Sequence, residues 1–229
     1  MQPPKAKLHD GVWLPEIEQH LVQMMSPGAK SFARLPDGRP AYQRHKYLAL
    51  LECVPTDRLQ VFVDIGSHVG LWSMQAEYNF DMVIAFEPQP LHADIYPHNM
   101  RGVNLGDYEL HRVALGETAG SVTLACEPTS TGDTHVAGPG DIPMATLDSF
   151  GLTRVDVIKI DTEGYELPIL RGAVETILRH RPIICVEQKG REVTYQGGQR
   201  DEAVAFLRSL GMVPLRAPIS GDHFLGWPA

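Results

Sequence analysis

The stretch that decides the fold covers residues 61–70 and reads Val-Phe-Val-Asp-Ile-Gly-Ser-His-Val-Gly. A β-branched and apolar run leads into a turn with two glycines, and an apolar helical pattern follows over residues 71–78. In an open α/β sheet such a turn lies at the carboxyl edge of a parallel strand, where these folds bind their ligands. The stretch therefore predicts a ligand-binding loop between a buried strand and a helix.

The remainder of the chain repeats this strand and helix alternation. The predicted strands cover residues 61–65, 82–86, 109–114, 155–160 and 183–186, and further helices are expected at 91–103, 164–179 and 199–210. Pro97 is expected to kink or shorten the helix that contains it. Residues 212–216 and 223–227 follow as two antiparallel strands joined by a turn. The alternation predicts an α/β fold with a mostly parallel sheet and helices on both faces.

Two further segments stand apart from this alternation. Apolar residues at helical spacing predict helices over residues 13–25 and 42–53, which we interpret as an N-terminal helical extension (1–56) before the main domain (57–229). Residues 127–143 are rich in proline and glycine and lack periodicity, which predicts a long loop that acts as a lid, binds a ligand or is disordered.

Composition limits the kinds of partner. The 229 residues are 43% hydrophobic and 21% charged, and no run of eighteen apolar residues occurs. Three widely spaced cysteines and an N-terminus without a signal-peptide pattern predict a reduced, cytoplasmic protein that makes no membrane contact. A formal charge of −8 disfavours nucleic acid and favours a small or neutral acceptor. A homo-oligomer stays open.

The chemistry of the loop bears on its ligand. A dinucleotide loop needs glycine at the middle position, where His68 stands, and Asp64 would repel a pyrophosphate. S-adenosylmethionine carries an ammonium group that suits Asp64 and a carboxylate that suits amides at the helix start. Glu87 ends the next predicted strand, where it can accept hydrogen bonds from both ribose hydroxyls. The alternative is structural: Asp64 caps a helix, Glu87 is solvated, and His68 either contacts the cofactor or caps the helix.

A second motif lies around the fourth predicted strand. Residues 155–166 read Val-Asp-Val-Ile-Lys-Ile-Asp-Thr-Glu-Gly-Tyr-Glu, and Leu-Arg-Gly-Ala follows at 170–173. With the flanks at 146–149 (Thr-Leu-Asp-Ser) and 181–187 (Arg-Pro-Ile-Ile-Cys-Val-Glu), this region resembles the FkbM-type methyltransferases. The similarity also includes residues 64–70, 86–88 and 113–116, and it extends over about 61–189. His68 departs from the asparagine that is common in the family.

The resemblance implies a class I methyltransferase fold, a seven-stranded Rossmann-like sheet with an antiparallel last strand. It implies S-adenosylmethionine as cofactor and transfer of its methyl group to an oxygen, often on a sugar or secondary metabolite. The residues expected to hold the cofactor are Asp64, Gly66, Ser67, His68, Gly70, Glu87, Pro88, Val113 and Ala114. The motifs do not identify the acceptor, for which a small molecule or glycoside is expected.

Acidic side chains follow the fourth and fifth predicted strands, and two mechanisms use them. In the first, Asp161 or Glu163 acts as general base beside Glu187. In the second, Asp161, Glu187 and Gln188 hold a divalent cation such as Mg²⁺ that acidifies the acceptor oxygen. Glu163 could instead cap the helix that begins at Gly164.

Two other polar side chains need separate interpretations. His135 is a further candidate base, because a lid could carry it to the reaction centre. Most loop histidines are only solvated. Lys159 lies mid-strand, where an ion-paired or snorkelling lysine is expected rather than a catalytic one.

Two rival functions remain. A ribose 2′-O-methyltransferase of RNA would use a Lys-Asp-Lys-Glu set made of Lys46, Asp161, Lys189 and Glu202, although the acidic composition opposes it. A cofactor-binding scaffold without catalysis would act through the N-terminal helices. The acidic residues at 161, 163 and 187 argue against the scaffold.

Overall fold

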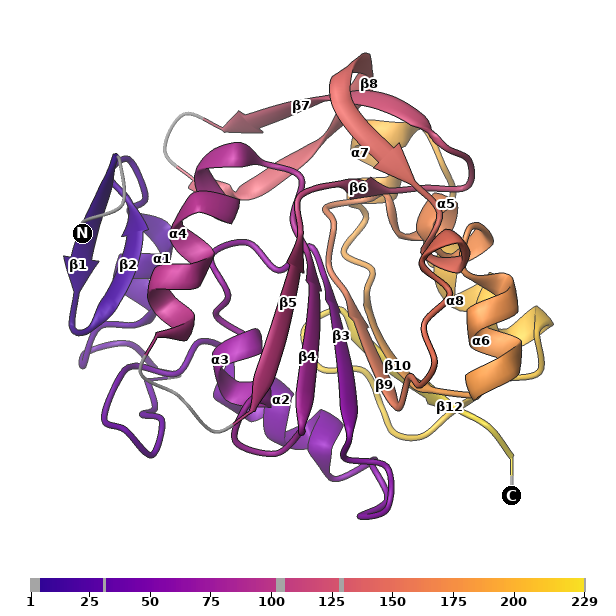
Figure 1. Cartoon of the computed structure of the whole chain (residues 1–229), viewed down its shortest axis with the longest axis horizontal. Helices are drawn as coiled ribbons and strands as arrows, with labels where there is room; N and C mark the ends of the chain where they lie inside the picture. Colours follow the sequence, from indigo (N-terminus) through magenta and orange to yellow (C-terminus); the bar gives the residue numbers. More distant parts are fainter. Residues whose placement is uncertain (1–4, 31, 102–105, 128–129, 229) are drawn as a thin grey trace.

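A seven-stranded sheet forms the centre of the computed structural model, which describes residues 5–30, 32–101, 106–127 and 130–228 (Figure 1). The strand order is β11-β12-β10-β9-β3-β4-β5, and only β12 runs against the others. The strands are β3 (Val61–Ile65), β4 (Met82–Phe86), β5 (Asp107–His111), β9 (Val157–Ile160), β10 (Ile183–Glu187), β11 (Val213–Pro214) and β12 (Asp222–Gly226). The predicted fold class is confirmed, including the antiparallel strand near the C-terminus.

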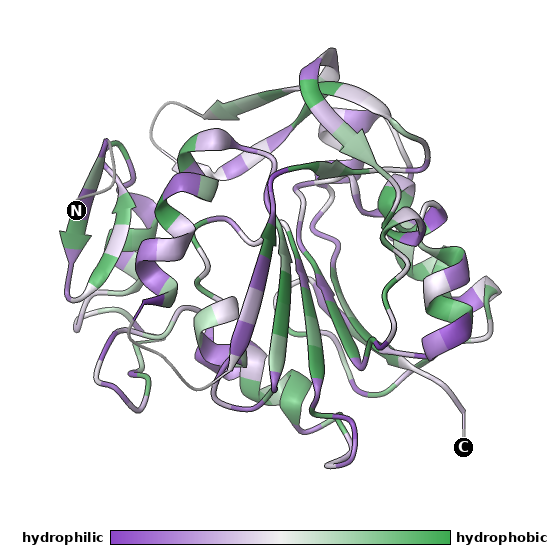
Figure 2. Ribbon diagram, in the orientation of Figure 1, coloured by the Kyte–Doolittle hydropathy of each residue, from purple (hydrophilic) through white to green (hydrophobic). Residues whose placement is uncertain are grey.

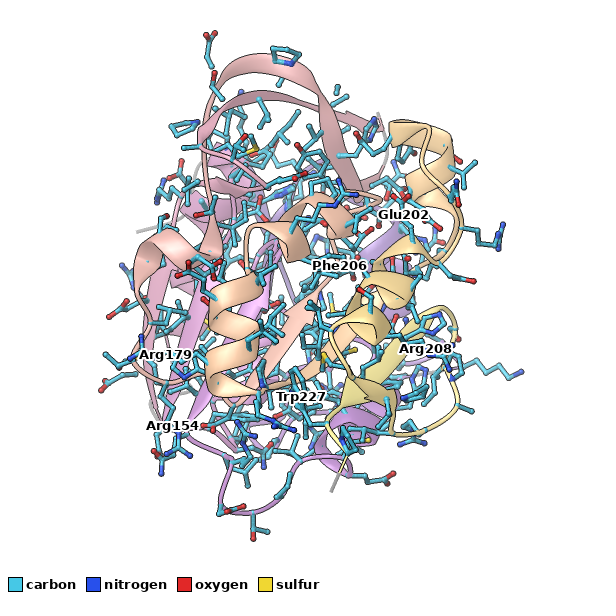
Figure 3. The ribbon with its side chains drawn as sticks, turned by 90° about the vertical axis from the view of Figure 1, so that its right-hand side faces the viewer. Arg154, Arg179, Glu202, Phe206, Arg208 and Trp227 are labelled. Carbon is cyan, nitrogen blue, oxygen red and sulfur yellow. The ribbon has the colours of Figure 1, made fainter. Side chains whose placement is uncertain are left out.

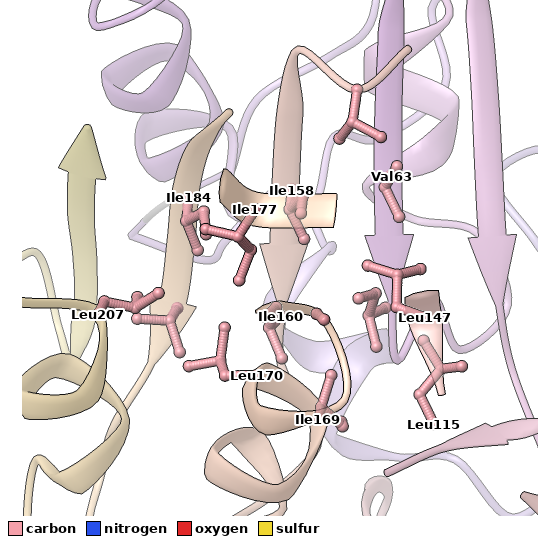
Figure 4. Packing of buried hydrophobic residues seen from close by; sticks show 14 of the residues in the cluster. Val63, Leu115, Leu147, Ile158, Ile160, Ile169, Leu170, Ile177, Ile184 and Leu207 are labelled. Atoms are coloured by element: carbon pink, nitrogen blue, oxygen red, sulfur yellow. The ribbon is translucent and has the colours of Figure 1, made fainter. Parts of the chain in front are cut away.

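Successive residues of a strand point to opposite faces of the sheet. Because apolar residues point to both faces here, helices cover both of them. The helices are α1 (His20–Met24), α2 (Arg44–Leu51), α3 (Ser73–Ala76), α4 (Pro90–Met100), α5 (Glu166–Arg171), α6 (Val174–His180), α7 (Arg191–Gln196) and α8 (Glu202–Ser209). Val63 and Ile158 pack with Leu170, Ile177 and Leu207 of α5, α6 and α8 (Figure 4). On the opposite face, strand residues such as Phe62 and Val83 pack against α2 and α3.

Hydrophobic burial also explains which strands lie in the middle of the sheet. The strands β3 and β4 are hydrophobic along most of their length, whereas the edge strand β5 carries hydrophilic residues (Figure 2). Burying one large aliphatic side chain contributes roughly 1.5–3 kcal/mol.

None of the helices in the described ranges is long and apolar enough to cross a membrane.

The N-terminal segment differs from the prediction. Residues 13–25 do not form one helix: β1 (Ala6–His9) and β2 (Val12–Pro15) form a hairpin whose turn contains Gly11 at a φ of 86°, and only the short α1 follows. The hairpin is fixed to α4, since Asn99 accepts a hydrogen bond from the amide of Trp13 and donates one to its carbonyl. Helical spacing over a short apolar run was therefore misleading, and Asp10-Gly11 was the better signal. The second predicted helix appears as α2.

The predicted long loop over residues 127–143 is also wrong. Apart from residues 128–129, which lie outside the described residues, this region belongs to β7 (Gly120–Glu127) and the long strand β8 (Ser130–Ala145). Their pairing contains register shifts, and Gly140 lies so close to β7 that a Cβ there would be 2.7 Å from the amide nitrogen of Thr123. The irregular spacing of glycine and proline follows these bulges and concealed the strand. Residues of the third predicted strand divide between β5 and β6 (Ala114–Leu115), and β6, β7 and β8 form a second sheet across the top of the first (Figure 1).

Three smaller differences concern helices. The predicted helix 164–179 is divided into α5 and α6 at Gly172, where a Cβ would lie 2.0 Å from the carbonyl oxygen of Gly116. The helix α4 continues through Pro97 to Met100, and the predicted end at Val103 lies outside the described residues. Helix α7 was not predicted.

Asp156 stabilises the sheet at the edge opposite the predicted ligand site. Its buried carboxylate accepts hydrogen bonds from the amides of Gln60 and Val61 and from Arg154. We expect Asp156→Ala to lower the free energy of unfolding by about 2 kcal/mol in urea titrations, because two amides lose a charged acceptor. Replacing the exposed Asp141 in the same way should change it little. Equal effects of the two substitutions would contradict this role.

Candidate active site

Two adjoining cavities lie at the carboxyl edge of the parallel strands, beneath β8. The first has a volume of about 530 Å³ and the second about 70 Å³. Both are lined by the following residues: Gly66, His68, Gly132, Asp161 and Glu163. The predicted glycine loop and the end of β9 thus meet at the junction of the two cavities.

The glycine loop owes its shape to close backbone contacts. Gly66 has a φ of 74°, and a Cβ there would lie 2.0 Å from the carbonyl oxygen of Asp161, so only glycine fits. The amides of Gly66 and Ser67 donate to the carbonyl of Phe86. Gly70 lies against the Tyr96 ring and is not among the residues that line the cavities, so its role is to pack the loop onto α4.

Asp64 lies on β3 next to Ser73 and Lys159. It is completely buried, accepts a hydrogen bond from the Ser73 hydroxyl at 2.6 Å and lies 3.9 Å from the Lys159 ammonium. Burial raises the pKa of this carboxyl although Lys159 opposes the shift. Since it lines neither cavity formed by the described residues, the predicted contact with a ligand ammonium group is not supported.

Glu87 has the position expected of a ribose ligand. It lines the second cavity together with Pro88, Val113 and Ala114. Its two carboxylate oxygens accept hydrogen bonds from the amides of His68 and Gln89, each at 2.8 Å. Every carboxylate oxygen has a second lone pair. The loop amides therefore orient Glu87 and leave acceptor capacity for hydroxyl groups.

His68 is placed between the two cavities. Its ring lies 3.9 Å from that of His92, and its Nε2 is 2.9 Å from the hydroxyl of Thr131 on β8. Burial, with His92 and Lys159 adding to it, holds the pKa of His68 well below its ordinary value. A neutral ring is thus available for hydrogen bonding, and it joins the glycine loop to the strand above.

Three carboxyl groups converge at the edge of the first cavity. One oxygen each of Asp161, Glu163 and Glu187 lies within 4.8 Å of the others. Burial and the nearby Asp161 raise the pKa of Glu163 to about 8 and that of Glu187 to about 9. Burial opposes ionisation of Asp161 too, but Lys159 and Lys189 outweigh it and hold its pKa below the usual value. Asp161 thus loses its proton most readily of the three, whereas Glu163 and Glu187 keep theirs to a higher pH than ordinary carboxyls do.

Of the predicted metal ligands, Asp161 and Glu187 come together and Gln188 does not. The Gln188 side chain points to the start of α8, where its oxygen accepts a hydrogen bond from the amide of Ala203 at 2.9 Å. The other carboxyls already have protein cations: Lys159 lies 3.4 Å from Asp161, Arg191 lies 3.2 Å from Glu163, and Lys189 contacts Glu187. Each of the three carboxyls therefore already has a protein cation beside it.

His135 lines the second cavity, which Asp161 and Glu163 also line. Its ring stacks on Tyr195 at 3.6 Å, and its Nδ1 lies 3.0 Å from the carbonyl of Asp133. The stack joins β8 to α7 in the roof of the site, and a role of His135 as a base stays a prediction.

Of the set imagined for RNA methylation, three residues gather and the fourth does not. Lys46 and Lys189 both approach Glu187, next to Asp161. Glu202 lies at the first turn of α8, where it accepts a hydrogen bond from the amide of Gln199 (Figure 3).

Several residues of the site were missed by the sequence interpretation. Tyr42 lines the first cavity, Arg191 pairs with Glu163, and Asp222 pairs at the sheet edge with Lys46, which the sequence suggested only for RNA methylation. Asp222 could have been found, because an antiparallel strand begins at the edge where the parallel strands end. Tyr42 carries no such signal, since it comes from a segment placed by tertiary packing.

Comparisons with known proteins agree with this geometry. A family model described as "Methyltransferase FkbM domain" matches residues 64–214, well over half of the chain. A protein named Methyltransferase 1 from Beauveria bassiana is 25% identical over 162 residues, which cover 56% of this chain and 65% of that protein. The Hexuronic acid methyltransferase AglP from Haloferax volcanii is 27% identical over 124 residues, covering 51% of each chain.

A solved structure shares the fold. The precorrin-6y C5,15-methyltransferase of Geobacter metallireducens superposes with a TM-score of 0.51 at 15% identity and covers 86% of this chain and 94% of its own. The chain spans between half and two thirds of the length of the curated relatives. The matched region contains the glycine loop, Glu87 and the carboxyl cluster, and the chain belongs to the FkbM methyltransferase domain family.

Proposed function

We propose that this chain binds S-adenosylmethionine and transfers its methyl group to a hydroxyl of a sugar or small secondary metabolite. The observation that carries the proposal is the junction of the two cavities, where Asp161 and Glu163 line both. A donor in one cavity and an acceptor in the other would meet beside these carboxyls. Holding the two reactants together in this way is the main contribution an enzyme makes to a displacement reaction.

The residues around the second cavity fit the adenosine half of the cofactor. Glu87 offers acceptors for the ribose hydroxyls, and Pro88, Val113 and Ala114 offer apolar contacts for a base. The cavity of about 70 Å³ is small for such a ligand, since pockets for small molecules usually exceed about 300 Å³. Five residues of β8 line it, so this strand must move outward when the cofactor enters: Thr131, Gly132, Thr134, His135 and Val136.

The methionine half fits the wall of the first cavity. The buried hydroxyl of Ser67 has no hydrogen-bond partner among the described residues and lines this cavity, so it can donate to the ligand carboxylate. The ionised Asp161 replaces Asp64 as the partner for the ammonium group.

The first cavity suits a polar acceptor. Gln19, Gln23 and Tyr42 line the side formed by the N-terminal segment. Amide and phenol groups can hydrogen-bond several hydroxyls at once. The relative named for hexuronic acid adds support for a sugar as the class of acceptor.

The protein's own chemical task is to remove the hydroxyl proton. The sulfonium of the bound cofactor supplies an activated methyl group, so its leaving group needs no acid. Glu163, with a pKa near 8, is suited to accept the acceptor proton. Arg191 keeps its carboxyl oriented toward the cavity.

The rival functions have less support. The two lysines of the RNA set are engaged by carboxylates, Glu202 lies elsewhere, and the chain has a net charge of −8. An affinity for RNA that falls steeply with salt concentration would support the RNA methyltransferase instead. Cofactor binding without transfer to any acceptor would favour the scaffold.

Cofactor binding should depend on Glu87. We expect Glu87→Ala to weaken S-adenosylmethionine binding about tenfold or more in calorimetry, because a charged hydrogen bond contributes roughly 1.5–3 kcal/mol. Glu109→Ala removes an exposed carboxylate from the neighbouring strand β5 and should bind like the unchanged protein. Unaltered affinity in the Glu87 variant would show that the second cavity does not hold the ribose.

The rate should follow the ionisation of Glu163. The base must be deprotonated to act, and its pKa is about 8. We therefore expect kcat to be low well below pH 8, to rise as the pH approaches 8, and to level off above it. Glu163→Gln should lower kcat by about 10²–10⁴-fold and remove this dependence. Release of S-adenosylhomocysteine with a glycoside panel measures both, with Glu117→Gln on the exposed surface as control. A pH profile that Glu163→Gln leaves in place would assign the base elsewhere.

Chelation offers an independent check on the protein cations. Since Lys159, Lys189 and Arg191 balance the three carboxyls, activity is expected to survive EDTA undiminished. Loss of activity that Mg²⁺ restores would instead establish the metal mechanism.

A further inference from the structure

A buried ion pair connects the two ends of the chain beneath the first cavity. The Lys46 ammonium on α2 lies 2.7 Å from the carboxylate of Asp222, the first residue of β12. The two side chains are only 3% and 5% exposed. Both residues fall outside the matched family region of 64–214. The pair is therefore an addition to the part of the site that the family match covers.

This pair also reaches the carboxyl cluster. The Lys46 ammonium lies 3.9 Å from Oε1 of Glu187, and Lys189 contacts the same oxygen. In the sheet, Glu187 and Asp222 are directly opposite one another on β10 and β12. Oε1 of Glu187 thus lies between two ammonium groups.

The charges around Glu187 come from several elements. They are Lys46 on α2, Lys159 on β9, Asp161 and Glu163 after β9, Lys189 after β10, Arg191 on α7, and Asp222 on β12. Tyr42 also lies near these carboxyls, but burial and their charges raise its pKa well above the ordinary value, so it stays neutral. The ammonium of Lys46 is consequently shared between two acids, Asp222 and Glu187.

We propose that Lys46 and Asp222 are positioning residues that together set the orientation and charge of Glu187 at the wall of the acceptor cavity. Asp222 anchors the ammonium, and the ammonium holds Oε1 of Glu187. A pair needed only for packing could be replaced by neutral side chains of similar size without loss, as is often found for buried ion pairs. The value of this pair to catalysis rests on the proposed methyl transfer, whereas its effect on Glu187 does not.

The proposal predicts opposite effects of two substitutions. Lys46→Met keeps an unbranched side chain that is one atom shorter and removes the cation, so the midpoint of Glu187 titration should rise by about one pH unit. Asp222→Asn removes a like charge and frees Lys46 for Glu187, so the midpoint should fall. Carbon NMR of the full chain labelled at the glutamate carboxyl carbon, with and without S-adenosylhomocysteine, measures both. The Glu187 signal is assigned by its loss in Glu187→Gln.

Asp156→Asn is the matched control, because it weakens an ion pair between a buried carboxylate and the exposed Arg154 at the opposite edge of the sheet and should leave the midpoint unchanged. Midpoints that stay constant, or that move in the same direction in both variants, would overturn the proposal. If Lys46→Met does not fold, the downward shift in Asp222→Asn alone decides. The titration needs no acceptor, so a failure of the glycoside panel would count against the proposed function and not against this pair.

Discussion

The structure depends on one buried cation, the ammonium of Lys159 in the middle of β9. It is 5% exposed, lies 3.4 Å from Asp161 and 3.9 Å from Asp64, and faces the ring of Trp72. A buried ammonium needs carboxylates around it. Asp161 directly follows β9, and Asp64 lies near the end of β3. These two neighbouring strands carry the family motifs. The same charge that stabilises the centre of the sheet keeps Asp161 ionised where the two cavities meet.

Periodic segments were predictable because their own sequences determine them. The strands β3 and β4 have the predicted bounds, and the seven-stranded arrangement is confirmed. Glu87 and the acids after β9 and β10 could be located because parallel strands end at one edge. The surroundings of Asp64 could not be predicted in this way, since the sequence does not show that its carboxylate contacts Ser73 and Lys159. Bulged strands such as β8 and contacts between distant segments were hidden for the same reason.

Segments outside the family match give the site its individual form. The N-terminal segment supplies one wall of the first cavity, and Glu18 accepts hydrogen bonds from the amide and hydroxyl of Thr131, which in turn contacts His68. The roof, the glycine loop and the N-terminal segment are therefore linked by buried hydrogen bonds. Such a connection links the position of β8 to the N-terminal wall of the first cavity.

The most direct test follows the methyl group itself. The protein is incubated with S-adenosylmethionine that carries carbon-13 in its methyl group and with a panel of glycosides, and the products are examined by NMR. The account predicts that the label appears as a methoxy carbon on a hydroxyl of an acceptor. Label that remains on a tightly bound cofactor, or that is transferred to nitrogen or carbon, would contradict it.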